Sequence, residues 1–222
     1  MGLMKKVVSF DLDGTLVDAG YGDVVWNRGI PEEYAKKYCI SFEEAKVLIR
    51  KQYESVGDAD LLWYEIDHWL ERFQLSVSSQ ELLDRYESHI RPCPHAQEVL
   101  EHLARRYTLI IASNAARVFV EKELACTGFG RYFAHTISAT TDFGMVKKKE
   151  GFFARLCEYM QVLPSEMAHI GDHPVFDHDT PTKLGIDSYY LAGVQQAGEG
   201  AGTPRADGRK TIRSLKELLE RL

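Results

Sequence analysis

Two carboxylates stand two residues apart near the start of the chain, directly after a short apolar run. The run Val7-Val8-Ser9-Phe10 leads into Asp11-Leu12-Asp13-Gly14-Thr15. Side chains two apart on a strand project to the same side, so Asp11 and Asp13 are expected to face one pocket. Two anions roughly 4 Å apart repel by about 4 kcal/mol at an effective dielectric near 20, so a cation or a proton is expected beside them. The arrangement predicts phosphate chemistry; an acidic surface turn is the alternative.

A second pair of polar residues follows another apolar run. Ser113-Asn114 comes directly after 108–112 and before a segment with helix signals. A hydroxyl and the amides at the start of a helix can together hold phosphate oxygens. The alternative is that Ser113 only caps the helix.

Two more carboxylates follow a later apolar run. Asp172 and Asp177 lie in Gly171-Asp172-His173-Pro174-Val175-Phe176-Asp177, directly after 167–170. In open parallel sheets, ligands bind at the carboxyl ends of the strands, which is where all these residues are expected. Lys147-Lys148-Lys149 lies between the two motifs, and a run of this kind is often only a solvated charged surface.

The elements that position these residues are short apolar strands separated by helices. Strands are expected at 6–10, 108–112, 136–139, 167–170 and 188–191, and helices near 95–105, 115–126, 149–160 and 212–222. This alternation is typical of a parallel sheet covered on both faces, so the predicted fold class is α/β with a Rossmann-like core. The Gly-rich stretch from Gly193 to Gly208 is expected to be a loop.

Residues 19–90 differ from the rest in carrying helix signals alone. Two capping boxes, Ser41-x-x-Glu44 and Ser78-x-x-Glu81, each open a helix-compatible stretch. The first strand belongs to the sheet, so this helical module is predicted to be an insertion. The sheet domain then comprises 1–18 and 91–222.

Composition leaves room for an enzyme without naming one. The 222 residues are 45% hydrophobic and carry a formal net charge of -6, which gives no basic footprint for nucleic acid. No apolar run is long enough for a membrane span, and no secretory signal is evident. Four scattered cysteines indicate thiols in a reducing compartment. A soluble, cytoplasmic protein is therefore expected, with an oligomeric state that the sequence leaves open.

The order Asp-x-Asp-Gly-Thr, strand-Ser-Asn, Lys and Gly-Asp-x-x-x-x-Asp resembles that of the haloacid dehalogenase superfamily of phosphohydrolases. The resemblance spans nearly the whole chain and equates 19–90 with the family's helical cap. It implies that the cap opens and closes about the connections 16–20 and 88–94 over a small phosphorylated metabolite.

The resemblance also implies roles for the first motif. Asp11 would be the nucleophile that forms an aspartyl-phosphate intermediate. Asp13 would protonate the leaving alcohol and then take a proton from the attacking water. Thr15 would tie down the loop rather than react.

The remaining motifs would hold the phosphate and a metal. Ser113 and Asn114 would bind phosphoryl oxygens, and Lys147 would neutralise charge in the transition state. A lysine follows Lys147 where the family commonly has proline, so Lys148 and Lys149 stay alternatives for the active-site lysine. Spacing from Asp142 to Phe152-Phe153 favours Lys147.

By the same resemblance, Asp172 would complete a Mg2+ site with the Asp11 carboxylate and the Asp13 backbone carbonyl. Asp177 would position Lys147 or metal-bound water. Hard oxygen donors beside a phosphate favour Mg2+ over zinc on chemical grounds as well. His173, directly after Asp172, is the histidine expected nearest to substrate.

Asp13 favours a phosphate monoesterase, because a haloalkanoate dehalogenase needs no second aspartate to protonate an alkoxide. A phosphomutase with the same core motifs and a non-catalytic metal- or phosphate-binding regulator remain alternatives. The natural substrate is not given by the sequence.

The aromatic side chains of the cap are expected to form its core rather than a substrate cage: Trp26, Trp63, Tyr64 and Trp69. Specificity contacts are expected just past the first hinge, from Tyr21, Asn27 and Arg28.

Overall fold

Six parallel strands form one sheet at the centre of the molecule. A computed structural model describes residues 5–146, 151–192 and 208–222. The strands are β1 (Val7–Phe10), β2 (Thr108–Ser113), β3 (Phe133–Ser138), β4 (Met167–Gly171), β5 (Asp187–Leu191) and β6 (Thr211–Ile212). Their spatial order is β3-β2-β1-β4-β5-β6, and every pairing is parallel. This is the order of a doubly wound Rossmann-like sheet, so the predicted fold class is confirmed.

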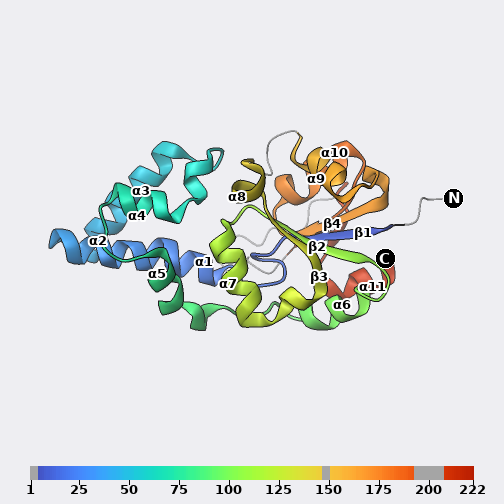
Figure 1. The fold of residues 1–222 in the computed structure, drawn as a ribbon, viewed down its shortest axis with the longest axis horizontal. Coiled ribbons are helices and arrows are strands. Elements are labelled where there is room, and N and C mark those ends of the chain that lie inside the picture. The colour runs from blue at the N-terminus through green and yellow to red at the C-terminus, as the bar shows by residue number, and fades with distance from the viewer. Residues whose placement is uncertain (1–4, 147–150, 193–207) are drawn as a thin grey trace.

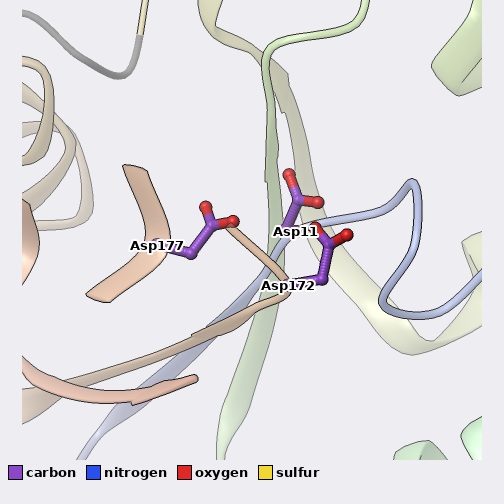
Figure 2. Close-up of side chains that lie close together, drawn as sticks. All are labelled: Asp11, Asp172 and Asp177. Carbon is purple, nitrogen blue, oxygen red and sulfur yellow. The ribbon is translucent and has the colours of Figure 1, made fainter. Parts of the chain in front are cut away.

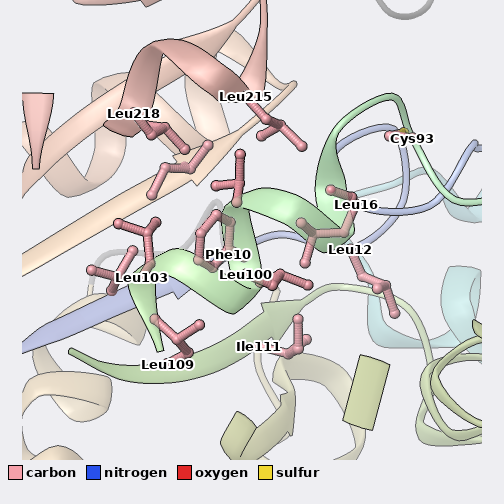
Figure 3. Close-up of a cluster of buried hydrophobic side chains, with 14 of the residues drawn as sticks. Phe10, Leu12, Leu16, Cys93, Leu100, Leu103, Leu109, Ile111, Leu215 and Leu218 are labelled. Atoms are coloured by element: carbon pink, nitrogen blue, oxygen red, sulfur yellow. The ribbon is translucent and has the colours of Figure 1, made fainter. Parts of the chain in front are cut away.

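Helices cover both faces of the sheet (Figure 1). The sheet region contains α6 (Ala96–Leu103), α7 (Arg117–Thr127), α8 (Ala139–Phe143), α9 (Phe152–Met160), α10 (Thr180–Leu184) and α11 (Leu218–Arg221). One cluster packs α6, α7 and α11 against side chains such as Phe10 and Ile111 (Figure 3). The other packs α9 against Val7 and Ile110. Successive strand residues thus enter opposite cores, which explains why the strands read as continuous apolar runs.

Between β1 and α6 the regular elements of the described chain are helices. It contains α1 (Gly20–Val24), η1 (Val25–Gly29), α2 (Ile30–Tyr38), α3 (Phe42–Val56), η2 (Leu61–Tyr64), α4 (Ile66–Arg72), α5 (Ser79–Arg85) and η3 (Glu87–His89). Both predicted capping boxes are present, at the starts of α3 and α5. Helices α2 to α5 gather to one side of the sheet (Figure 1) and share a hydrophobic cluster of their own, which Phe119 of α7 also enters.

Two predicted elements differ from the structure. The segment 212–222 does not begin as a helix, because Thr211 and Ile212 add β6 to the sheet edge before the short helices η7 (Leu215–Glu217) and α11. The strand expected at 136–139 begins earlier, at Phe133, and ends at Ser138, whose side chain also caps α8 by accepting from the Thr141 amide. In both places tertiary pairing overrides the local apolar pattern. No helix in the described ranges is long and apolar enough to cross a membrane.

Candidate active site

Three carboxylates meet at the carboxyl-terminal edge of the sheet. Asp11 follows β1, Asp172 follows β4, and Asp177 lies in η6 (Pro174–Asp179). One carboxylate oxygen from each lies within 4.8 Å of the others, and Figure 2 shows the three side chains converging. Asp11 and Asp177 are buried, and Asp172 is half-buried. Each pair of unit charges at this separation repels by roughly 3 kcal/mol at an effective dielectric near 20, so the cluster can hold a cation.

The loop after β1 places Asp11 and Asp13 on one cavity, as predicted, but not through strand alternation. Strand β1 ends at Phe10, and the chain then turns through Gly14 at φ +75°, a conformation that favours glycine. The Gly14 amide donates to the Val17 carbonyl at 2.7 Å, which closes the turn.

Thr15 contributes to this loop through its main chain. Its amide donates to the Leu12 carbonyl at 3.2 Å. The hydroxyl is buried and has no hydrogen-bond partner among the described residues. The predicted tying role therefore does not come from a described hydroxyl contact.

The close approach of Asp177 to the end of β4 depends on glycine. A Cβ built on Gly171 would lie 2.3 Å from Asp177 Cγ, far inside van der Waals contact. Asp177 Oδ2 accepts from the His173 amide at 3.0 Å, and Oδ1 lies 3.1 Å from His169 Nε2. An ionised Asp177 would only accept, which requires the proton on His169 Nε2; Nδ1 of the neutral ring would then accept from Ser9 Oγ, 3.0 Å away. The buried side chains of Ser9 and His169 thus form a series of hydrogen bonds that holds the Asp177 carboxylate in place.

His173 lines the cavity beside Asp172, as predicted, and also shapes the turn. Its Nδ1 accepts from the amides of Val175 and Phe176, each at 3.2 Å, and its ring stacks on Phe176 with centroids 3.7 Å apart. The ring therefore caps η6 at the edge of the cavity.

The predicted phosphate-binding residues end β2. Ser113 is buried, and its Oγ accepts from the Ala115 amide at 3.0 Å. Ser113 and Asn114 both line the cavity that Asp11 lines. Ser113 does not cap α7, whose N-cap is Ala116. The lysine candidates Lys147, Lys148 and Lys149 lie outside the described residues.

The cavity has a volume of about 830 Å³, and two chemically different groups of side chains line it. The first group, at the sheet edge, comprises the carboxylates with Ser113 and Asn114. The second group is aromatic and comprises Trp26, Tyr53, Trp63 and Tyr64 of the inserted helices with Phe119 of α7. This revises the prediction that the cap aromatics form only a core: Trp69 is fully buried, but Trp26, Trp63 and Tyr64 line the cavity.

Two of the residues predicted to be specificity contacts, Tyr21 and Arg28, do not line this cavity. Tyr21 is fully buried, and its hydroxyl donates to the Leu83 carbonyl at 3.1 Å. Arg28 is paired with Glu32 at 2.7 Å and lines a smaller hollow that shares Asn27 and Lys46 with the main cavity. Asn27 does line the main cavity, and the cationic side chains among its described lining residues are Lys46 and Arg50 of α3. Tyr21 packs inward from α1, so a position close to the hinge does not by itself bring a side chain to the cavity.

Sequence reasoning missed Glu123, a fully buried acid on α7. Burial raises the pKa of its carboxyl well above the usual range, and the nearby charges of Asp13 and Asp11 raise that pKa further. The available signal was position: Glu123 falls one helical turn after Phe119, on the face of α7 that also buries Val120 and Leu124.

The sequence as a whole matches a known family. The model of the family described as haloacid dehalogenase-like hydrolase matches residues 5–179. The chain belongs to the haloacid dehalogenase-like hydrolases. This confirms the resemblance drawn from the four motifs and makes the protein a hydrolase.

Among relatives of this haloacid dehalogenase-like hydrolase is the GMP/IMP nucleotidase YrfG of Escherichia coli K12. The two are 24% identical over 217 residues, which cover 97% of this chain and 94% of the relative. A HAD phosphatase from Thermococcus onnurineus has a similar fold, with a TM-score of 0.81, 24% identity, and coverage of 98% of this chain and 97% of that one. A 2-haloacid dehalogenase from Pseudomonas syringae pv. Tomato DC3000 also matches, with a TM-score of 0.61, 22% identity, and coverage of 98% and 97%. One fold thus carries both reactions, and the reaction must be argued from the site.

Proposed function

We propose that the protein is a Mg2+-dependent phosphatase that hydrolyses a small-molecule phosphate monoester through an aspartyl-phosphate on Asp11. The observation that carries the proposal is the meeting of three carboxylates with Asp13 and Ser113 on one cavity at the strand ends. Asp13 distinguishes this reaction from dehalogenation, because only an alkoxide leaving group needs a proton donor.

In the first step an Asp11 carboxylate oxygen attacks phosphorus, the ester P–O bond breaks, and the leaving oxygen takes a proton from Asp13. In the second step water attacks the same phosphorus and gives a proton to Asp13, and Asp11 leaves with the bonding pair. Asp13 therefore ends each cycle protonated again. Ser113, Asn114 and a lysine, with Lys147 preferred, would hold the phosphoryl oxygens.

The acidic cluster suits Mg2+, since its donors are hard carboxylate oxygens. Asp11, Asp172 and the Asp13 carbonyl would hold the ion, and Asp177, fixed by His169, would support them. When bound, Mg2+ would offset the charge of these carboxylates and of the phosphate dianion.

The helical residues 19–90 would act as a cap on the core formed by 1–18 and 91–222. Their separate hydrophobic cluster and their aromatic contribution to the cavity support this division. We place the enzyme in the cytoplasm; the four free thiols, two of them exposed, suit a reducing compartment.

The aromatic side chains that line the cavity favour a nucleoside monophosphate as substrate. Trp26 is stacked on Phe119, with ring centroids 5.7 Å apart and planes 15° from parallel, and both residues line the cavity that Asp11 lines. A nucleobase can stack on aromatic side chains, whereas the phosphate would bind at the carboxylates. The nucleotidase activity in the name of the Escherichia coli relative points the same way.

Phosphate release from a panel of phosphate esters, with and without Mg2+, tests the proposal. Wild type should release phosphate only with Mg2+, and Asp11→Asn should lose at least about 1,000-fold of kcat. Asp67→Asn, an exposed acid-to-amide change in α4, is the control. No turnover on any ester would favour the regulatory alternative, and interconversion of sugar phosphates without phosphate release would indicate a mutase.

A further inference from the structure

Two buried hydroxyl groups beside the start of α8 hold the loop that follows β2. Thr140 lies in α8, and Ser138 is the last residue of β3. The Thr140 hydroxyl donates to the Asn114 carbonyl at 3.1 Å, and the Ser138 hydroxyl donates to the Ala115 carbonyl at 2.8 Å. The two hydroxyl oxygens also lie 3.2 Å from each other. When each hydroxyl gives its single hydrogen to its own carbonyl, both carbonyls of the loop are satisfied at once.

The Asn114 carbonyl and the Ala115 amide belong to one peptide group, so the bond from Thr140 fixes both. A trans peptide is planar, and its C=O and N–H point in opposite directions. On the side away from Thr140, the Ala115 amide donates to Ser113 Oγ at 3.0 Å. The Ser113 hydroxyl thus accepts from the loop, and among the described residues no acceptor takes its own hydrogen.

These bonds form one series that starts outside the cavity and ends on it. Ser113, Asn114 and Ala115 line the cavity, whereas Thr140 is not among the described residues that line it. Every donor in the series points the same way, from Thr140 through the peptide to Ser113, and hydrogen bonds arranged in this way strengthen one another. The last hydrogen, on Ser113 Oγ, is available to an anionic oxygen in the cavity.

We propose that Thr140 is a positioning residue for phosphate binding, which acts through the peptide between Asn114 and Ala115 to fix the Ser113 hydroxyl as a donor to a phosphoryl oxygen. The inference rests on the proposed function, in which Ser113 holds the phosphoryl group. Without the Thr140 hydroxyl, the Asn114 carbonyl loses its donor. A turn of this peptide toward the cavity would then bring the negative carbonyl oxygen close to the phosphate and take the Ala115 amide away from Ser113.

Binding of inorganic phosphate in the presence of Mg2+, measured by titration calorimetry, tests the inference without turnover. Thr140→Val keeps the shape of the side chain and removes the hydroxyl, so it should weaken phosphate binding by about 10-fold, as for the loss of one net hydrogen bond. Thr140→Ser keeps the hydroxyl and should bind phosphate within about twofold of wild type. Thr108→Val, the same change at the exposed start of β2, is the control. Ser138 is less suitable for this test because its hydroxyl also caps α8.

A double variant separates the positioning role from a merely structural one. If Thr140 acts through Ser113, adding Thr140→Val to a protein that already carries Ser113→Ala should weaken phosphate binding by less than about twofold more. An equal loss with and without the Ser113 hydroxyl would overturn the inference. So would a Thr140→Ser protein that binds phosphate as weakly as Thr140→Val.

Ester turnover by the same proteins distinguishes a failure of this inference from a failure of the proposed function. In an active enzyme, kcat/KM should follow phosphate affinity across the variants, and a Thr140→Val enzyme equal to wild type in both would overturn the inference alone. Phosphate binding that depends on Thr140 in a protein that hydrolyses no ester would overturn the proposed phosphatase activity and leave the inference standing. Neither binding nor turnover by wild type would overturn both.

Discussion

At the scale of single residues, the carboxylate of Asp177 reaches the acidic cluster because residue 171 has no side chain. Gly171→Ala would place a Cβ 2.3 Å from Asp177 Cγ and push the carboxylate away. A misplacement of about 1 Å in a catalytic site can cost roughly 100-fold, so kcat with Mg2+ should fall by about that factor. Steady-state kinetics across a Mg2+ titration measure it.

Gly130→Ala is the matched control, because its new Cβ would lie 3.9 Å from Leu124 Cβ, in ordinary contact. If the two alanine variants have equal activity and equal Mg2+ dependence, the close approach at Gly171 does not matter to the site.

The residues with chemistry could be chosen from the sequence, but their surroundings could not. Asp11, Asp172 and Asp177 meet as the motifs predicted, since each follows a strand of one parallel sheet. Glu123 escaped notice because a buried polar residue on an apolar helix face has no local signature in the sequence. Tyr21 was expected at the cavity because it lies just past the first hinge, whereas its side chain is fully buried among the inserted helices.

At the scale of elements, the capping boxes of the inserted helices are expected to matter for stability and not for catalysis. Ser41 Oγ accepts from the Glu44 amide at 3.3 Å at the start of α3. Ser41→Ala removes this bond and should lower the free energy of unfolding by about 1 kcal/mol while leaving kcat unchanged. Urea denaturation and steady-state kinetics on the same preparation check both parts, and Ser55→Ala, near the end of the same helix, is the control. An unchanged denaturation midpoint would contradict the assignment.

The turn after β4 is tied to the start of β6 by an ion pair with a defined pH signature. Arg209 Nε and Nη2 donate to Asp179 at 2.8 and 2.6 Å, and this pairing lowers the pKa of Asp179 from 3.8 to about 2. A pKa lowered on folding adds stability above the unfolded value, and that stability is lost as the pH falls toward the folded value. Asp179→Asn should therefore destabilise the protein at pH 7 by about 1 kcal/mol, with a difference that narrows below pH 4. Urea unfolding at a series of pH values measures it, and a pH-independent difference would rule out this charge effect.

The prediction of a helix over 212–222 is wrong at its start because Ile212 belongs to β6. Its two residues, Thr211 and Ile212, are too few for a periodic signal, and pairing with Tyr190 and Leu191 of β5 defines them as a strand. The longer strands and the capped helices, which carry their own local signals, were predicted close to their observed positions.

At the scale of the whole molecule, residues of the sheet edge and residues of the inserted helices line the same cavity. The proposed reaction and the proposed choice of substrate therefore depend on one cavity. Trp26→Ala should raise KM for a purine nucleoside monophosphate by about 10-fold, consistent with a stacking contribution of about 1–3 kcal/mol. KM for glycerol 3-phosphate should stay within about twofold, because that ester has no ring to stack. Tyr159→Ala, an exposed aromatic outside the cavity lining, is the control. An equal rise in KM for both esters would mean that Trp26 supports the shape of the cavity without binding a nucleobase.

The sequence predicted an all-helical insertion because residues 19–90 carry helix signals alone, whereas strands and helices alternate in the rest of the chain. The sequence did not predict that aromatic residues of these helices line the cavity. Helical spacing alone cannot distinguish a side chain that packs among the inserted helices from one that lines the cavity. Trp69 and Trp26 share that spacing signal and differ only in what lies opposite, which for Trp26 is Phe119 from α7.

The most direct test of the central claim is chemical trapping of the intermediate on Asp11. Enzyme quenched during turnover with Mg2+ and then treated with borohydride should carry homoserine at position 11, because borohydride reduces an acyl phosphate. Peptide mass spectrometry locates the change, and Asp11→Asn should show none. Rapid phosphate release with unmodified Asp11, or with the modification at another residue, would contradict the account.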